Sequence, residues 1–341
     1  MYNILSIFTG AGGFDVGFHG GFKFLNKSFK RTKFRTHTSL DFNRHAVRTV
    51  KEDEKYFKGT TSYCENIIEF DSNKIKEPKL GFDVLLGGFP CLQFSTQGKR
   101  HGIKDDISGK LYLQYCEYVD TFQPKIFIAE NVKGILSANS GDAIKIITKR
   151  FEDTGYTVSV HLVNFANYGV PQLRERVLFI GVRKDLIGEF KVPKFTNTAL
   201  NYISSGRALN NIEEDANNNE LNRINAKTIE RINAIPPGGN FKDLPKELSV
   251  KGMMSNIYRR LDKNKPGYTI TASGGGGTMG YHFDIPRALT NRERARLQGF
   301  PDDFVFKGSL SECRRQIGNA VPPVGIYPFA KEVQRILDIN K

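Results

Sequence analysis

The sequence predicts an α/β fold, a doubly wound and mostly parallel sheet followed by a smaller domain of irregular or β structure. Apolar runs that resemble strands alternate with amphipathic helical segments such as residues 111–122 and 144–151. The first strand, residues 4–8, ends in a glycine turn. Residues 84–86 are continuously apolar, as in a strand that is covered on both faces. The composition and the periodicity of the sequence change near Asp185, where we expect the first domain to end.

Composition and charge limit the class of protein. With 341 residues, 39% of them hydrophobic, the chain is long enough for one large and one smaller domain. No apolar run approaches the roughly 18 residues that span a bilayer, and residues 1–8 lack the basic start of a signal peptide. The net charge of +14 and the isoelectric point near 9.5 favour an anionic partner, most often a nucleic acid. Charge alone does not separate DNA from RNA or from a membrane surface.

The cysteines give no pattern of metal ligands or disulfides. Cys64, Cys91, Cys116 and Cys313 include no Cys-x-x-Cys pair, so we expect neither a zinc site nor a disulfide framework. This usage fits a protein of the reducing cytoplasm.

The first strand runs into a turn that a ligand can approach. Residues 9–14 read Thr-Gly-Ala-Gly-Gly-Phe and precede a helix, an arrangement in which dinucleotide-binding folds hold a cofactor. The spacing differs from Gly-x-Gly-x-x-Gly, so a tight turn without a ligand is about as well supported. A second strand ends at Asp41, where an acidic residue can bind a cofactor ribose. The alternative for Asp41 is a cap of the helix that begins near Arg44.

A single thiol is expected at the same edge of the sheet. The apolar run 84–86 continues through Gly87 and Gly88 to Cys91, and open parallel sheets bind ligands at the carboxyl ends of their strands. Residues 95–110 are polar and contain glycine, so they can form a mobile loop over a ligand. Taken alone, a lone cysteine is more often a buried structural residue, by about three to one.

A carboxyl group and two guanidinium groups follow. The strand of residues 126–129 ends in Glu130, which can donate a proton to a substrate, with capping of the next turn as the alternative. Gln172, Arg174 and Arg176 occupy alternate positions of an extended segment and therefore share one face. Two guanidinium groups on one face suit a carbonyl, a carboxylate or a phosphate.

Residues 186–286 contain asparagine-rich tracts and glycine-rich runs without a long helical period, so we expect a domain that presents loops. Hydrogen-bond donors, aromatic rings and glycine are mixed near Arg259, Arg260 and Thr271, as contact with a nucleic-acid groove or base edge requires.

Helical structure returns in the last part of the chain. Thr290 and Glu293 form a capping-box pattern that predicts the start of a helix. A final helix carries the apolar stripe Phe329, Val333, Ile336 and Leu337, which we expect to pack on the first domain.

Six motifs follow one another in the order of a known family. They are residues 8–13 (Phe-x-Gly-x-Gly-Gly), 88–91 (Gly-Phe-Pro-Cys), 130–132 (Glu-Asn-Val), 172–176 (Gln-x-Arg-x-Arg), 287–301 (Arg-Ala-Leu-Thr-Asn-Arg-Glu-x-Ala-Arg-Leu-Gln-Gly-Phe-Pro) and 318–322 (Gly-Asn-Ala-Val-Pro). Together they resemble the cytosine-5 DNA methyltransferases of bacterial restriction-modification systems, over nearly the whole chain. Any one match could arise by chance, but six in order could not.

The resemblance implies an organisation and a reaction. Residues 1–185 would bind S-adenosyl-L-methionine and carry out catalysis, residues 186–286 would recognise the target, and the last helix of residues 287–341 would complete the first domain. The enzyme would methylate C5 of a cytosine flipped out of a specific sequence in double-stranded DNA. We expect a monomer in the bacterial cytoplasm, associated with the nucleoid and not with a membrane. The resemblance leaves open a restriction endonuclease that acts on the same site without a stable complex.

The resemblance also assigns catalytic roles. The thiolate of Cys91 would add to C6 of the cytosine, because C5 is too weak a nucleophile to accept a methyl group unaided. Glu130 would hold a proton against N3 and the exocyclic amine as charge develops on the ring. Arg176, supported by Arg174, would bind the O2 edge of the ring. No metal takes part.

The cofactor residues follow from the same motifs. Phe8, Gly10 and Gly12 would contact the methionine end, Asp41 the ribose, and Phe42 a face of the adenine, with Asn66, Ile67, Pro90 and Asn319 completing the site. The chain departs from the family in three places. Leu92 stands where Gln is usual, Asp41 where Glu is commoner, and Asn66 where Asp is commoner, so we expect weaker affinity for ribose and adenine.

Three other functions deserve comparison. An RNA methyltransferase of the same family would share the catalytic motifs, but the sizeable segment between Arg176 and Arg287 favours DNA. A nicotinamide oxidoreductase would explain only the first glycine turn. A non-catalytic DNA-binding relative would be expected to lack Cys91 or Glu130, and both are present.

Overall fold

The fold is known from a computed structural model that describes residues 1–89, 107–250, 257–272 and 276–341. Its central sheet consists of β1 (Tyr2–Ile7), β4 (Phe34–Asp41), β5 (Thr61–Cys64), β6 (Val84–Gly87), β7 (Ile126–Val132), β8 (Tyr156–Asn164) and β9 (Glu175–Arg183). The strands lie in the order β5-β4-β1-β6-β7-β9-β8. All neighbours pair in parallel except β9, which is antiparallel to both β7 and β8. The predicted mostly parallel sheet is confirmed.

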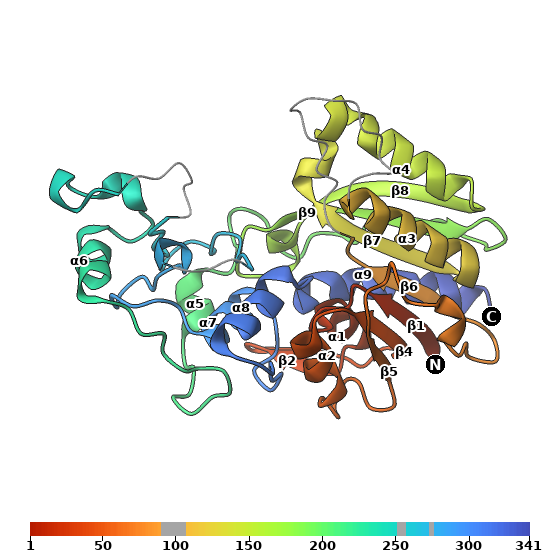
Figure 1. The fold of residues 1–341 in the computed structure, drawn as a ribbon, viewed down its shortest axis with the longest axis horizontal. Coiled ribbons are helices and arrows are strands. Elements are labelled where there is room, and N and C mark those ends of the chain that lie inside the picture. The colour runs from red at the N-terminus through yellow and green to blue at the C-terminus, as the bar shows by residue number, and fades with distance from the viewer. Residues whose placement is uncertain (90–106, 251–256, 273–275) are drawn as a thin grey trace.

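Helices cover both faces of this sheet (Figure 1). The helices α1 (Gly13–His19) and α9 (Pro323–Ile339) pack against one face, and α3 (Ile107–Phe122) and α4 (Asp142–Glu152) pack against the other. The remaining helices are α2 (Arg44–Lys51), α5 (Ser205–Leu209), α6 (Ala226–Ala234), α7 (Asn291–Leu297) and α8 (Leu310–Asn319). A small hairpin joins β2 (Phe22–Phe24) to β3 (Lys27–Phe29). Short 3-10 turns are η1 (Ser72–Lys74), η2 (Lys133–Leu136), η3 (Ala138–Gly141), η4 (Phe165–Tyr168), η5 (Phe241–Asp243), η6 (Lys246–Leu248) and η7 (Gly276–Thr278).

The apolar runs of the sequence are buried as predicted. Val84 and Leu86 pack into the core shared with α1 and α9, whereas Leu85 packs into the core shared with α3 and α4. The predicted stripe of α9 also enters the first of these cores, with Phe329 and Val333 fully buried. The C-terminal helix therefore completes the layer on one face of the sheet.

The direction of winding reverses between β1 and β6. From β1 the chain adds β4 and β5 on one side, then crosses to add β6 and β7 on the other. The carboxyl ends of these strands lie together, since Ile7 pairs with both Leu40 and Gly87, and Gly87 pairs with Ala129. Open α/β sheets bind ligands at such a switch point.

Residues 186–286 are irregular, with two short helices, α5 and α6, in the described part. Their β pairing, within the ranges that the structure describes, consists of isolated bridges such as Arg260 to Tyr281. A separate small core is formed by Ile232, Ile235, Tyr258, Met279, Tyr281 and Ala288. The helix α6 was not expected from the sequence. No helix in the described part of the chain is long and apolar enough to cross a membrane.

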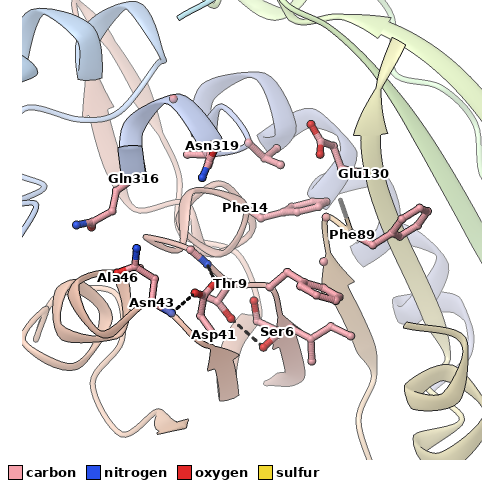
Figure 2. Close-up of a pocket in the computed structure, with 18 of the residues that line it drawn as sticks. Ser6, Thr9, Phe14, Asp41, Asn43, Ala46, Phe89, Glu130, Gln316 and Asn319 are labelled. Carbon is pink, nitrogen blue, oxygen red and sulfur yellow. Dashed lines mark hydrogen bonds between the residues drawn. The ribbon is translucent and has the colours of Figure 1, made fainter. Parts of the chain in front are cut away.

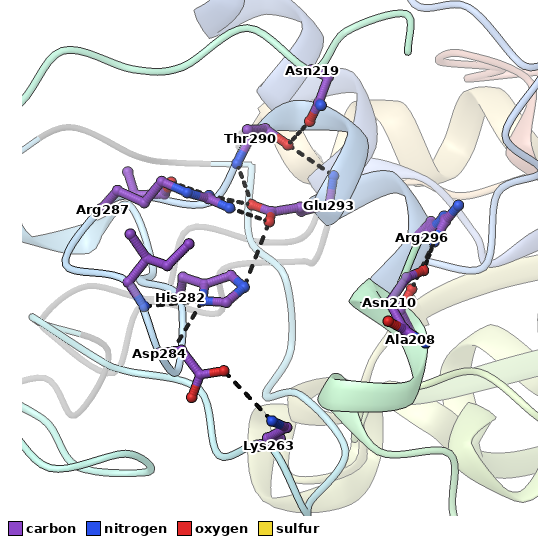
Figure 3. A network of polar contacts seen from close by, with 12 residues as sticks. Ala208, Asn210, Asn219, Lys263, His282, Asp284, Arg287, Thr290, Glu293 and Arg296 are labelled. Atoms are coloured by element: carbon purple, nitrogen blue, oxygen red, sulfur yellow. Dashed lines mark hydrogen bonds and ion pairs between the residues drawn. The ribbon is translucent and has the colours of Figure 1, made fainter. Parts of the chain in front are cut away.

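The start of α7 is fixed by the predicted capping box, which the structure confirms (Figure 3). The hydroxyl of Thr290 accepts the backbone N–H of Glu293 at 3.1 Å, and the Glu293 carboxylate accepts the backbone N–H of Thr290 at 2.8 Å. Glu293 also accepts two hydrogen bonds of 2.7 Å from the guanidinium of Arg287. The Glu293 carboxylate thus stabilises both the first turn of α7 and the segment from Arg287 that leads into it.

A buried polar network lies beneath the glycine turn. The Asp15 carboxylate accepts hydrogen bonds from Ser6 Oγ at 2.9 Å and Thr36 Oγ1 at 2.7 Å, and His19 Nε2 accepts the backbone N–H of Thr36 at 3.0 Å. Burial raises the pKa of Asp15 from 3.8 to about 6 and lowers the pKa of His19 from 6.5 to about 3. In mild acid the two groups therefore have opposite effects on stability.

We expect Asp15→Asn to make the free energy of unfolding more sensitive to acid. Between pH 6 and pH 3.8 the folded protein binds a proton at Asp15 that the unfolded chain does not, so this group adds stability as the pH falls. The variant lacks this gain, and its stability relative to wild type should decrease by up to ~1.4 kcal/mol per pH unit in that window. Urea unfolding of both proteins across the window would measure it. A difference between them that is independent of pH would contradict the raised pKa.

Candidate active site

A cavity of about 470 Å³ opens at the carboxyl edge of the sheet, where β1, β4, β6 and β7 end. Glu130 and Phe89 lie at one end of it and Asn43 and Gln316 at the other, with Asp41 between them (Figure 2). The structure brings together in this cavity the following residues singled out from the sequence: Phe8, Gly10, Asp41, Phe42, Glu130, Arg174, Arg176 and Asn319.

The turn after β1 has a backbone that few residues adopt. Phe8, Gly10 and Gly12 have positive φ angles of 52°, 56° and 76°. At Gly12 an added Cβ would lie 2.2 Å from Cζ of Phe57, so both conformation and space require glycine. Gly12 does not line the cavity and instead shapes the turn. Phe8 holds its conformation at a cost of roughly 1–3 kcal/mol, a strain that is usual where a structure is fixed for a ligand.

Asp41 ties the glycine turn to the start of α2. Its Oδ2 accepts the N–H of Gly10 at 2.7 Å, and its Oδ1 accepts the N–H of Asn43 at 2.8 Å. Burial raises the pKa of Asp41, although these hydrogen bonds oppose the rise. The side chain that caps α2 is that of Asn43, not Asp41. Each carboxylate oxygen retains a lone pair that a ribose hydroxyl can use.

The residues expected around an adenine ring are placed unevenly. Phe42 lies at the mouth of the cavity with 76% of its surface exposed, so its ring is available for stacking. Asn66 and Ile67 do not line the cavity. The Asn66 amide donates to Glu69 Oε1 at 3.2 Å, and Ile67 is buried in the core beside α3. The adenine contacts expected of these two residues stay predictions, since the Asn66 amide is used locally and the Ile67 side chain is covered in this structure.

Glu130 and Arg176 form a buried ion pair at the inner end of the cavity. Nε of Arg176 lies 2.9 Å from Oε1 of Glu130, and both side chains are almost covered. The Arg176 N–H does not point at this oxygen, so Oε1 has no hydrogen-bond donor among the described residues. A buried carboxylate oxygen without a donor is costly unless a ligand supplies one. Oε1 of Glu130 is therefore placed to accept a hydrogen bond from an N–H group of a bound molecule.

The segment that leads to the expected nucleophile is held by Asn131. Its Nδ2 donates to the carbonyl of Phe89 at 3.1 Å, which joins the end of β6 to β7. Pro90, Cys91 and Leu92 lie outside the described residues, as does most of the expected covering loop.

Arg174 lines the cavity beside Arg176, and its guanidinium is bound by the backbone. Its guanidinium donates to the carbonyls of Ile270 at 3.1 Å, Gly318 at 3.0 Å and Ala320 at 3.1 Å. Burial, with a smaller effect of Arg176, lowers the pKa of Arg174 to about 9. The Arg174 guanidinium is therefore occupied by backbone carbonyls, and it connects residues 268–272 to the turn between α8 and α9.

Two of the three residues considered for DNA reading are also engaged internally. Arg260 is buried and donates to the carbonyls of Ile232, Ile235 and His282, so it cannot reach a base without unfolding this region. The backbone of Thr271 abuts Gly318, where an added Cβ would lie 2.2 Å from the Thr271 carbonyl carbon. The third residue, Arg259, has a guanidinium that is not bound by backbone carbonyls of the described residues.

The guanidinium of Arg259 lies 4.5 Å from the ring centre of Tyr268, as a cation above an aromatic face. No hydrogen bond or ion pair of this guanidinium to another described residue is found. The Tyr268 ring therefore holds the guanidinium in place, and its N–H donors form no hydrogen bond to a described residue.

Sequence reasoning missed several residues of the cavity. They include Ser6, Asn43, Ala46 and Gln316, whereas Thr9, Phe14, Phe89 and Asn131 stood inside recognised motifs without a role of their own. Asn43 and Ala46 follow Phe42 closely, so extending that stretch by a few residues would have found them. In the described part of the chain no three His, Cys, Asp or Glu side chains are grouped to hold a metal.

Comparison with known proteins gives consistent matches over the full length. The family described as C-5 cytosine-specific DNA methylase matches residues 2–335. The type II methyltransferase M.NgoFVII of Neisseria gonorrhoeae is 44% identical, with 99% of this chain and 87% of that protein aligned. The type II methyltransferase M.BbvI of Brevibacillus brevis is 39% identical, over 94% of this chain and 87% of the relative.

Solved structures share the fold at low identity. A putative DNA modification methyltransferase encoded within a prophage of E. coli superposes with a TM-score of 0.74 at 22% identity, covering 99% of this chain and 100% of that one. A mutant of Spodoptera frugiperda DNMT2 gives a TM-score of 0.67 at 18% identity, with 98% and 100% of the chains covered.

We expect Arg174→Lys to destabilise the protein by about 2–3 kcal/mol, because one ammonium cannot replace a fork of donors to three buried carbonyls. Cofactor affinity should also fall, since the turn that carries Asn319 loses its support. Arg183→Lys, a change on the same strand at an Arg paired with exposed Asp185, is the matched control and should have little effect. Urea unfolding and cofactor titration would measure both. An equal free energy of unfolding and an equal cofactor affinity in Arg174→Lys and wild type would rule out that Arg174 supports the turn between α8 and α9.

Proposed function

The chain belongs to the C-5 cytosine-specific DNA methylase family, and from this premise we propose the roles of its residues in methylation. It is a DNA (cytosine-5-)-methyltransferase that uses S-adenosyl-L-methionine. It serves as the modification enzyme of a type II restriction-modification system, as supported by the two type II relatives aligned over nearly the whole chain.

The Glu130–Arg176 pair is the observation that carries this assignment of roles. The edge of a cytosine presents an exocyclic amine that donates, then N3 and O2, which both accept. Oε1 of Glu130, which has Arg176 as an ion-pair partner but accepts no hydrogen bond from a described residue, suits the amine, and the guanidinium of Arg176 suits the O2 edge. Because the pair is buried, these contacts act in a low dielectric, where they are stronger than in water.

In the proposed reaction the Cys91 thiolate forms a bond to C6, and the displaced electron pair moves through the ring towards N3. Glu130 supplies a proton there, so negative charge does not accumulate. The bound cofactor supplies a methyl group on a sulfonium centre. C5, made nucleophilic by the addition, would take up the methyl group as its bond to sulfur breaks and leaves a neutral thioether, and N3 would return its proton to Glu130. A base would then remove the C5 proton, and the electrons of that bond would expel Cys91 as a thiolate. The target base must be flipped out of the duplex, at a cost of a few kcal/mol.

The elongated cavity supports a cofactor whose reactive end lies towards Glu130. Asp41 is proposed to accept the ribose hydroxyls, and Phe42 to stack on the adenine from the exposed rim. The strained turn at Phe8 and Gly10, together with Asn319, is proposed to hold the methionine end. Asn66 and Ile67 take no part in this proposal, because neither lines the cavity.

Residues 186–286 are proposed as the target-recognition domain, between a catalytic domain of residues 1–185 and the return segment 287–341. Within it Arg259 is the described residue best suited to a DNA contact, since its guanidinium is held on Tyr268 with unused donors. Arg260 is withdrawn as a base-reading residue for the reason given above. A monomer in the bacterial cytoplasm, functionally paired with an endonuclease of the same site, completes the proposal.

We expect wild-type protein to form a covalent adduct with a duplex that carries 5-fluorocytosine at the target, because fluorine cannot leave C5 as a proton does. Cys91→Ala should form none, and Cys91→Ser should be without turnover, since a hydroxyl is a far weaker nucleophile than a thiolate. Cys64→Ala, which removes an exposed thiol, is the control and should still form the adduct. Denaturing electrophoresis would show the adduct, and its persistence in Cys91→Ala would exclude Cys91 as the nucleophile.

We expect Glu130→Gln to lower the methylation rate by a factor on the order of 10² or more, because the amide cannot supply the proton. Affinity for S-adenosyl-L-methionine should change little. Glu117→Gln on the exposed face of α3 is the matched control. Single-turnover kinetics and cofactor titration would separate the two effects. A large loss of cofactor binding with an unchanged rate would place Glu130 in the cofactor site instead.

A further inference from the structure

Two more cavities continue from the active site along the surface. A second cavity of about 510 Å³ shares Val132 and Arg176 with the first and is also lined by Lys133 and Thr269. A third cavity of about 530 Å³ contains Arg259. The second and third cavities have one lining residue in common, Leu173.

Leu173 is an exposed apolar side chain between two cavities that are lined by charged residues. It is 45% exposed, although its neighbours Gln172 and Arg174 are buried. Its N–H donates to the carbonyl of Gly267 at 2.8 Å, and its carbonyl accepts the hydroxyl of Thr269 at 2.6 Å. Because the backbone is held from both sides, the leucine is presented in one place between the two cavities.

Cationic groups lie on either side of this leucine. In the second cavity Arg176 is joined by Lys133, which pairs with Glu175 at 2.9 Å in a half-exposed bridge that a phosphate can replace. In the third cavity the guanidinium of Arg259 lies on Tyr268 with its donors unused. The order along the surface is therefore cation, apolar side chain, cation.

A DNA strand has the complementary order, in which anionic phosphates flank an apolar deoxyribose face. We propose that Leu173 packs against the deoxyribose of a nucleotide next to the target cytosine, while the two cavities take the phosphates on either side. This inference rests on the proposed function, because the strand must leave the active-site cavity past Val132 and Arg176.

The contact has a consequence for the choice of substrate. A ribonucleotide at this position would place its 2′-hydroxyl against leucine methyl groups, which displace water from it and offer it no hydrogen bond. The donor of the nearby Thr269 hydroxyl is already used by the Leu173 carbonyl. Leu173 thus selects DNA over RNA at one nucleotide of the methylated strand.

The test uses duplexes of the methylated sequence in which one nucleotide of the target strand at a time is a ribonucleotide. We expect wild-type protein to methylate the duplex substituted at one position beside the target roughly tenfold more slowly than the all-deoxy duplex, from the loss of about one hydrogen bond to water. Leu173→Asn offers the hydroxyl a partner and should bring this ratio close to one. Leu162→Asn, at a 46% exposed leucine of β8 that lines none of the three cavities, is the matched control and should retain it.

The outcomes separate the two proposals. Failure of wild-type protein to methylate the all-deoxy duplex would overturn the proposed function itself. The role of Leu173 alone would be overturned if no single ribonucleotide slowed methylation by wild-type protein. It would also be overturned if Leu173→Asn showed the same ratio of all-deoxy to ribonucleotide-substituted rates as wild type, and Leu173 would then be an ordinary exposed leucine.

Discussion

The irregular half of this protein depends on buried guanidinium groups that bind backbone carbonyls. Residues 186–322 contain few long helices and no paired strands in their described part, so many carbonyls lack a partner from regular structure. Arginines supply the donors. Arg174 binds three carbonyls, Arg296 binds those of Ala208, Asn210 and Asn211, and Arg292 binds those of Asn217, Pro301 and Phe304. Each planar fork satisfies several acceptors at once, which a lysine could not do.

These contacts also explain why the site has its shape. The regular sheet brings the ends of β1, β4, β6 and β7 to one edge, and this alone places Asp41 and Glu130 in one cavity. The remaining wall is the turn between α8 and α9, which no strand supports. Arg174 holds that turn through Gly318 and Ala320 and at the same time binds Ile270. The cofactor cavity and the segment beside Thr271 are therefore built on one shared support.

The sequence predicts the sheet well because apolar runs and glycine turns are local signals. It also predicts that Arg174 and Arg176 share a face, since alternation in an extended segment is local too. It does not reveal that Arg174 is covered, because its partners Ile270 and Gly318 lie 96 and 144 residues away. The burial of Arg260 and Ile67 is not visible in the sequence for the same reason, because depth of burial is set by other segments of the chain. The helix α6 was missed because it has only nine residues and buries only two of them, Thr228 and Ile232.

The contact between Gly318 and Thr271 limits how freely the recognition part can be exchanged. An added Cβ at residue 318 would lie 2.2 Å from the carbonyl carbon of Thr271, so the two backbones touch with no side chain between them. A chimaera that imports residues 186–286 from a relative must therefore reproduce the path of the main chain near residue 271 to within a fraction of an ångström. Junctions placed before residue 267 would keep the native strap of residues 267–272 with the catalytic part. If residues 186–286 carry specificity as proposed, that specificity can be exchanged as a module only up to residues 267–272.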